Sequence, residues 1–100
     1  MTISVLTPDK QLFQGNIISV KVPGTLGQFQ VLKNHAPIVS SLEAGEVHIV
    51  TAAGGYEFYD EISGNIQIGT DAGRTIKFTI GGGFIEVSKN VVSLLVHGTK

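Results

Sequence analysis

Apolar and polar residues alternate with a period of two along most of this chain. The alternation is clearest in residues 18–22, 46–49 and 76–80. A period of two is typical of a strand with one face in a core and the other in solvent. β-branched residues dominate these segments, and no segment keeps the 3.6-residue period of a helix. The pattern therefore predicts an all-β protein.

The turn signals divide the chain into about ten short, mostly antiparallel strands. Breaks are expected at Gly15-Asn16, within 52–55, where a hairpin closes, and within 70–73, a hairpin turn into the next strand. The regular spacing favours a two-sheet β-sandwich that spans residues 1–100 as a single domain. The residues expected inside are Val5, Phe13, Val20, Val22, Phe29, Val31, Val47, Ile49, Phe78, Ile80, Ile85, Val87, Leu94 and Val96.

The stretch 22–42 is the most distinctive part of the chain. It contains two tight-turn signals, Pro23-Gly24 and Ala36-Pro37, on either side of a short apolar alternation. Gly24 and Gly27 bracket two residues, which indicates a compact loop. The stretch is expected to read as strand, loop, strand, corner and strand, with no helix through it.

The amino-acid composition argues against several classes of function. The chain has 100 residues, 42% hydrophobic and 15% charged, with a formal net charge of −1 and no cysteine. These values indicate a globular domain without disulfides or thiolate metal sites. The seven basic residues are scattered along the sequence, so a phosphate-binding stripe and nucleic-acid binding are not expected. No apolar run approaches the roughly 20 residues of a membrane helix, and the N-terminus lacks a secretory signal pattern, so we expect a cytosolic protein or one that partners hold at a membrane.

No constellation of catalytic, metal or cofactor residues stands out. The three histidines lie far apart at positions 35, 48 and 97, without ligand spacing. A Ser/His/Asp triad is recognised by geometry and is not excluded by composition, but no Gly-x-Ser-x-Gly motif supports one. Asp60-Glu61 is a poor acid/base pair, because adjacent strand residues point to opposite faces. We expect no catalytic residue, no metal ion and no cofactor.

The run Gly81-Gly82-Gly83 has two readings. A phosphate-binding loop would need a helix to follow it, whereas residues 84–87 are expected to form a strand. The alternative is a bulge or strand crossover where glycine lets backbones approach closely. The second reading is favoured.

The order and spacing of several motifs resemble the N-terminal β-sandwich domain of the epsilon subunit of F-type ATP synthases. The first block is a Pro-Gly-Thr-x-Gly-x-Phe-x-Val-Leu pattern followed by His-Ala-Pro, and the second begins at the glycine run. The residues that carry the resemblance are Pro8, Phe13, Gly15, Pro23, Gly24, Thr25, Gly27, Phe29, Val31, Leu32, His35, Ala36, Pro37, Leu42, Gly45, Gly82, Gly83, Phe84, Glu86, Val87, Asn90 and Val91.

The resemblance implies a non-catalytic rotor subunit that links the gamma subunit to the c-ring and couples proton flow to ATP synthesis. The residues implied on the c-ring side are Thr25, Gln28, Asn34 and His35. Those implied on the gamma side are Ser40, Ser41 and Gly82. The subunit would be peripheral to the membrane through its partners, without inserting into lipid. Its expected location is the cytoplasmic face of a bacterial inner membrane, with the stromal side of a chloroplast thylakoid as the second choice.

Four features qualify the resemblance. Many relatives have an acidic residue where this chain has Gln28, which can hydrogen-bond but cannot form a charge pair. His35 could instead be a turn histidine whose ring bonds a neighbouring carbonyl. The stretch 57–75 is longer than expected, which predicts an extended or additional hairpin. Many epsilon subunits continue into two C-terminal helices, whereas this sequence stops at Lys100: either this member lacks the helices or the sequence has been shortened. Without them, the family's helix-mediated brake on hydrolysis is also expected to be absent.

The alternative is a free-standing β-sandwich module that binds a ligand such as a glycan or peptide. Such modules present exposed aromatic rings for stacking. The chain has no tryptophan, and Tyr56 and Tyr59 are the outward candidates.

Overall fold

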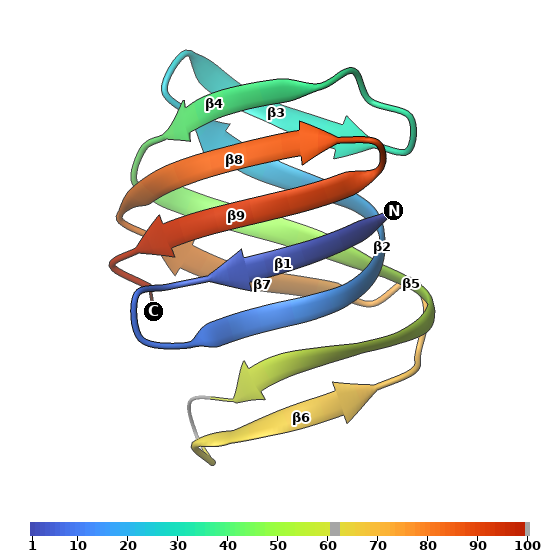
Figure 1. Ribbon diagram of the computed structural model, residues 1–100. Helices are drawn as coiled ribbons and strands as arrows, with labels where there is room; N and C mark the ends of the chain where they lie inside the picture. Colours follow the sequence, from blue (N-terminus) through green and yellow to red (C-terminus); the bar gives the residue numbers. More distant parts are fainter. Residues whose placement is uncertain (61–62, 100) are drawn as a thin grey trace.

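The structure, a computed structural model, describes residues 1–60 and 63–99, and every regular element in these ranges is a β-strand (Figure 1). The strands are β1 (Thr2–Leu6), β2 (Gln11–Gly24), β3 (Gly27–Leu32), β4 (Ile38–Leu42), β5 (Gly45–Asp60), β6 (Asn65–Gly69), β7 (Thr75–Ile80), β8 (Gly82–Ser88) and β9 (Val91–His97). The all-β prediction is confirmed, and residues 22–42 contain no helix. Glu61, part of the acidic pair considered above, Ile62 and the last residue, Lys100, lie outside the described residues.

Two predicted breaks are wrong, because the chain continues through them in two long strands. β2 has 14 residues and passes through Gly15-Asn16, and β5 has 16 residues and passes through 52–55. The two strands pair antiparallel, with register shifts between Gly15 and Ile17 and between Ile17 and Ser19. On β5 the four residues 52–55 lie opposite Asn16 alone, since Thr51 pairs with Ile17 and Tyr56 with Gly15. The irregularity bends β5, and Gly54 and Gly55 accommodate it with φ values of +112° and +92°.

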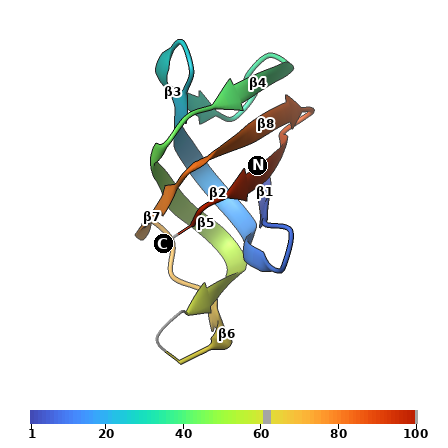
Figure 2. The same ribbon diagram turned by 90° about the vertical axis from the view of Figure 1, so that its left-hand side faces the viewer.

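The bends let β2 and β5 belong to both layers of the sandwich. The first layer has the strand order β3, β2, β5, β7. The second layer has the order β4, β8, β9, β1, then the N-terminal half of β2, the C-terminal half of β5, and β6. All pairs are antiparallel except β1 with β9. Figure 2 shows the two layers nearly edge-on, with β6 below them. A two-sheet sandwich is therefore formed within one continuous hydrogen-bonded ladder.

β6 and β7 follow one another along β5 and do not pair together. β6 pairs with residues 56–60 of β5, and β7 pairs with residues 45–50. The predicted hairpin turn at Thr70–Gly73 is therefore wrong. Residues 70–74 instead connect β6 to β7, which run one after the other in the same direction along β5. The prediction of an extended hairpin within 57–75 is correct, and Figure 1 shows β6 and the end of β5 projecting beyond the sandwich.

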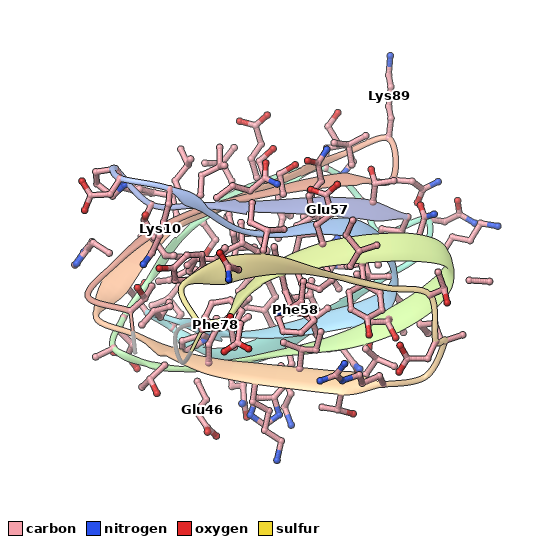
Figure 3. All side chains as sticks on the ribbon, turned by 90° about the horizontal axis from the view of Figure 1, so that it is seen from below. Lys10, Glu46, Glu57, Phe58, Phe78 and Lys89 are labelled. Carbon is pink, nitrogen blue, oxygen red and sulfur yellow. The ribbon has the colours of Figure 1, made fainter. Side chains whose placement is uncertain are left out.

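The core lies between the layers and follows the predicted phase. Of the expected residues, Phe29 and Phe78 are half-buried at its border and the others are buried. Figure 3 shows Phe58 and Phe78 between the two layers. Five further residues complete the buried apolar set: Ile3, Ile17, Leu42, Tyr56 and Val92.

The glycine run is a corner where the chain passes from β7 in the first layer to β8 in the second. Gly83 has a φ of +152°, and a Cβ there would overlap the Leu95 carbonyl oxygen and lie 2.9 Å from the Val96 Cα. The crossover reading is thus the one the structure bears out, because β8 begins within the run and no described helix follows it.

We expect Gly83→Ala to lower the free energy of unfolding by about 3 kcal/mol, because it combines an unfavourable φ with a backbone clash. Gly27→Ala is the matched control: its φ is +128°, and nothing lies within 4 Å of the added Cβ. The control should lose about 1 kcal/mol, the cost of φ alone. Urea denaturation measures both, and equal losses would show that close packing at the corner is unimportant.

Candidate partner interface

The outer face of the second layer carries a row of exposed apolar side chains. Ser41 pairs with Phe84, Phe84 with Leu95 and Leu95 with Leu6, so these four side chains lie side by side on β4, β8, β9 and β1. Phe84 is 58% exposed and Leu95 54% exposed. We call Phe84, Leu95 and Leu6 the apolar row. Three neighbouring apolar side chains in solvent are typical of a surface that a partner covers.

A shallow groove of about 530 Å³ runs along the apolar row. Besides the row itself, Ser41, Pro8 and His97 line it. The groove is open and mostly apolar, which suits a protein surface better than a small polar ligand.

The residues predicted on the gamma side fall at one end of this row, but only one of them faces solvent there. Ser41 is exposed next to Phe84. Ser40 alternates with it, points toward the interior and is half-buried, and its Oγ donates a hydrogen bond to the Ser41 carbonyl at 3.4 Å. Gly82 is buried and pairs with His97. Ser41 is thus the member of the set best placed to touch a partner.

The residues predicted on the c-ring side divide between the two ends of β3. Thr25 and Gln28 lie at the β2–β3 turn, and Asn34 and His35 lie in the loop after β3. Gln28 and Asn34 are six positions apart, about 20 Å at the rise of an extended strand. The structure therefore does not bring the four together in one cluster.

At the β2–β3 turn, Thr25 lies beside a residue predicted for the other partner. The Thr25 and Ser41 hydroxyl oxygens are 3.2 Å apart, and the Thr25 N–H donates to the Ser41 carbonyl at 3.2 Å. Leu26, at the tip of this two-residue turn, is fully exposed. Sequence reasoning did not single out Leu26 as a candidate contact, although an apolar residue between turn glycines was a visible signal.

At the other end of β3, local hydrogen bonds hold the loop. The Asn34 N–H donates to Asn90 Oδ1 at 2.7 Å, and Asn90 Nδ2 donates to Asn34 Oδ1 at 3.2 Å, which ties the loop to the β8–β9 turn. The His35 ring nitrogen Nδ1 lies 2.7 Å from the Ala36 carbonyl oxygen. His35 is thus a turn histidine whose ring nitrogen Nδ1 bonds a neighbouring carbonyl, as the alternative interpretation predicted.

A second set of polar side chains anchors residues 70–74, the connection between β6 and β7, to β5. The Tyr56 hydroxyl donates to Asp71 Oδ1 at 2.6 Å and accepts from Arg74 Nη1 at 3.2 Å. Thr51 Oγ1 donates to the Asp71 carbonyl at 2.7 Å and accepts from the Arg74 N–H at 3.0 Å. Sequence reasoning did not find this cluster, because 15 residues separate Tyr56 from Asp71.

This cluster shifts two titrations. The hydrogen bond from Tyr56, and then a backbone hydrogen bond, lower the pKa of Asp71 below its ordinary value. The hydrogen bond to Asp71, and then burial, raise the pKa of Tyr56. The Tyr56 phenol therefore stays neutral and the Asp71 carboxylate stays ionised. The hydrogen bond between them holds residues 70–74 against β5.

The two tyrosines do not form a stacking platform for a ligand. Tyr56 is buried, and its ring stacks on Phe13 with centroids 5.7 Å apart, so the expectation that it points outward is wrong. Tyr59 is half-buried, and Lys10 Nζ lies 3.9 Å from its ring centroid. Neither ring is open to a sugar or peptide as the ligand-binding alternative requires.

The part of the chain that the structure describes offers neither a cluster of metal ligands nor a membrane-spanning helix. There, no three His, Asp or Glu side chains gather closely enough to hold a metal ion. The same residues include no helix with the length and apolarity needed to cross a membrane.

Residues 1–64 match the family described as ATP synthase, Delta/Epsilon chain, beta-sandwich domain. Several curated relatives match almost the whole chain. The ATP synthase epsilon chain of Chlorobaculum tepidum is 36% identical over 96 residues, which are 96% of this chain and 88% of that protein. The epsilon chain of Leptospira borgpetersenii is 35% identical over 100 residues, which are 98% of this chain and 62% of that protein. The chain thus spans less than two thirds of the length of some relatives.

Solved structures show the same fold. A chain of the Euglena gracilis mitochondrial ATP synthase, in a structure of OSCP, F1 and c-ring, matches with a TM-score of 0.72 at 19% identity. The match covers 98% of this chain and 51% of that chain. A chain of the Tetrahymena thermophila central stalk and c-ring structure matches with a TM-score of 0.69 at 16% identity, over 100% of this chain and 65% of that one.

We expect Tyr56→Phe to lower the melting temperature by roughly 5 °C at neutral pH, because it removes the hydroxyl that bonds Asp71 and Arg74. The pKa of Asp71 is lowered by folding, so its contribution exists above the ordinary pKa of aspartate and disappears as pH falls through the lowered value. The wild type should therefore lose more stability than Tyr56→Phe between about pH 6 and about pH 3. Melting curves across that range test this, with Tyr59→Phe as control. Parallel pH profiles of wild type and Tyr56→Phe would contradict it.

Proposed function

The chain belongs to the family of ATP synthase delta/epsilon chain β-sandwich domains, and from this premise we propose that it is a non-catalytic rotor subunit of an F-type ATP synthase. In this role it joins the gamma subunit to the c-ring in the central stalk, and so couples proton flow to ATP synthesis in the other subunits. The names of its bacterial relatives support a peripheral subunit of a membrane-associated complex, and we propose that it lies on the cytoplasmic face of a bacterial inner membrane.

The observation that carries the proposal is the apolar row. Its three side chains lie on three neighbouring strands of a close-packed sandwich. Because their backbone is already ordered, little conformational entropy is lost when a partner binds them. Each large apolar side chain contributes about 1.5–3 kcal/mol when it is fully buried. We assign the row, with Ser41 at its end, to the gamma subunit.

The c-ring is assigned to the two ends of β3. At the β2–β3 turn, Leu26 is an apolar tip and Gln28 an exposed amide next to it. At the other end, the exposed Asn34 side chain and the half-buried His35 ring sit on a loop that Asn90 holds. The two ends are too far apart to serve one small contact, so variants at each end identify which one meets the ring.

We expect Leu95→Glu to weaken binding to the cognate gamma subunit by roughly 2 kcal/mol, about 30-fold in Kd, because it places a charge within the apolar row. Leu32→Glu is the matched control: Leu32 on β3 is 50% exposed, close to the 54% of Leu95, but it lies in the other layer. Titration calorimetry measures both affinities, and melting curves check that both variants fold. Equal affinities would remove the row from the interface, and no binding by the wild type at micromolar concentration would overturn the proposed function.

We expect Gln28→Lys and His35→Asp to weaken coupling to the c-ring without unfolding the domain, since both side chains are at surface positions. The measurement is ATP synthesis driven by a proton gradient in vesicles that contain the reconstituted complex. Gln14→Lys, on an exposed position of the second layer, is the control for the added charge. A defect in one variant alone assigns the ring to that end of β3, whereas normal synthesis in both removes these residues from the contact.

A further inference from the structure

The outer face of the first layer carries a second ordered set of side chains. Lys21 pairs with His48, His48 with Lys77, and Lys21 also with Gln30, so these residues lie in one register across β3, β2, β5 and β7. We call Lys21, His48 and Lys77 the cationic row. Neighbouring strands are about 4.8 Å apart, so the row spans about 10 Å. The basic residues that are scattered in the sequence are thus partly gathered by the fold.

The lysines of the row lack the carboxylate partners that a sheet usually places opposite them. Each lysine lies opposite His48, and the two lysines are two strands apart. In the described part of the chain, the carboxylate that meets the row is Glu46, whose Oε1 lies 3.1 Å from His48 Nε2. Neither lysine forms an ion pair there. Figure 3 shows Glu46 pointing outward into solvent.

The corresponding cross-strand registers of the two outer faces differ in charge. In the second layer this register carries Glu86 and Glu57, among Val39, Ser4 and Ile68, and no lysine or arginine, while Lys10 lies beside it over the Tyr59 ring. The first layer instead presents two lysines and a histidine against one glutamate. The domain has a net charge of −1, so this separation arises from the fold and is not visible in the composition.

We propose that the cationic row is a second docking surface, which binds an acidic segment of a partner protein. Charge complementarity identifies the partner: the ammonium groups attract carboxylates, while His48 and the Gln30 amide supply hydrogen bonds between and beside them. Two lysines on a domain of net negative charge are too few for a nucleic acid or an anionic membrane, which require several phosphate contacts. The proposal concerns this face alone and does not rest on the proposed role in ATP synthase.

The test is a titration of the full chain, labelled with ¹⁵N, with a short poly-L-glutamate peptide at low salt. Shift changes should concentrate at Lys21, Gln30, His48 and Lys77 and should fade as ionic strength rises to about 0.3 M, where charges are screened within several ångströms. Lys21→Gln with Lys77→Gln should weaken binding about tenfold. Its melting temperature should equal that of the wild type, because neither lysine forms an ion pair in the described part of the chain.

The matched control is Lys10→Gln with Lys89→Gln, which changes the net charge by the same amount. Lys10 lies over Tyr59, and Lys89 is in the β8–β9 turn, where Figure 3 shows it pointing away from the sandwich. This variant should bind the peptide as the wild type does. Equal weakening in both double variants would reduce the effect to net charge and overturn the proposal. Absence of binding, or shifts centred on the apolar row, would overturn it as well.

Discussion

The pairing of β2 with β5 is the interaction on which the rest of the structure depends. Every other strand reaches the sandwich through one of these two or through a neighbour that pairs with them. The pairing includes an irregular stretch around Asn16 and 52–55, where both strands turn from one layer to the other. Because the same backbones run through both layers, the layers are joined by covalent bonds as well as by the packing of a shared core.

The sequence predicted the core well, because burial in a sandwich depends mainly on the two-residue period of each strand. It predicted strand ends less well. Gly15-Asn16 and the glycines within 52–55 have the composition of turns, yet they form bends inside long strands, since pairing with a partner strand outweighs the local preference. Tyr56 illustrates the same limit: its phase is compatible with either face, and its burial depends on Phe13 and Asp71, which are distant in sequence.

The candidate interfaces were harder to predict, because they depend on register between strands. Phe84, Leu95 and Leu6 occupy positions that look like the polar phase of three separate strands, and only their pairing makes them one surface. Lys21, His48 and Lys77 are likewise scattered in the sequence and adjacent in the sheet. By contrast, Thr25 and Gln28 could be placed near one another from the turn glycines alone, whereas Asn34 and His35 proved to lie at the opposite end of β3.

The chemistry of the two outer faces suits a domain that is held between partners. One face is apolar with acidic residues around it, and the other is polar with a cationic row, so the two faces are not interchangeable and the domain can be bound in one orientation. A force applied to the apolar row on β1, β8 and β9 reaches β7 through β2 and β5, whose backbones cross the molecule. The core between the layers is close-packed, and such interiors have low compressibility and transmit strain. Such stiffness is what the proposed rotor role requires of a small domain that is held between two bodies.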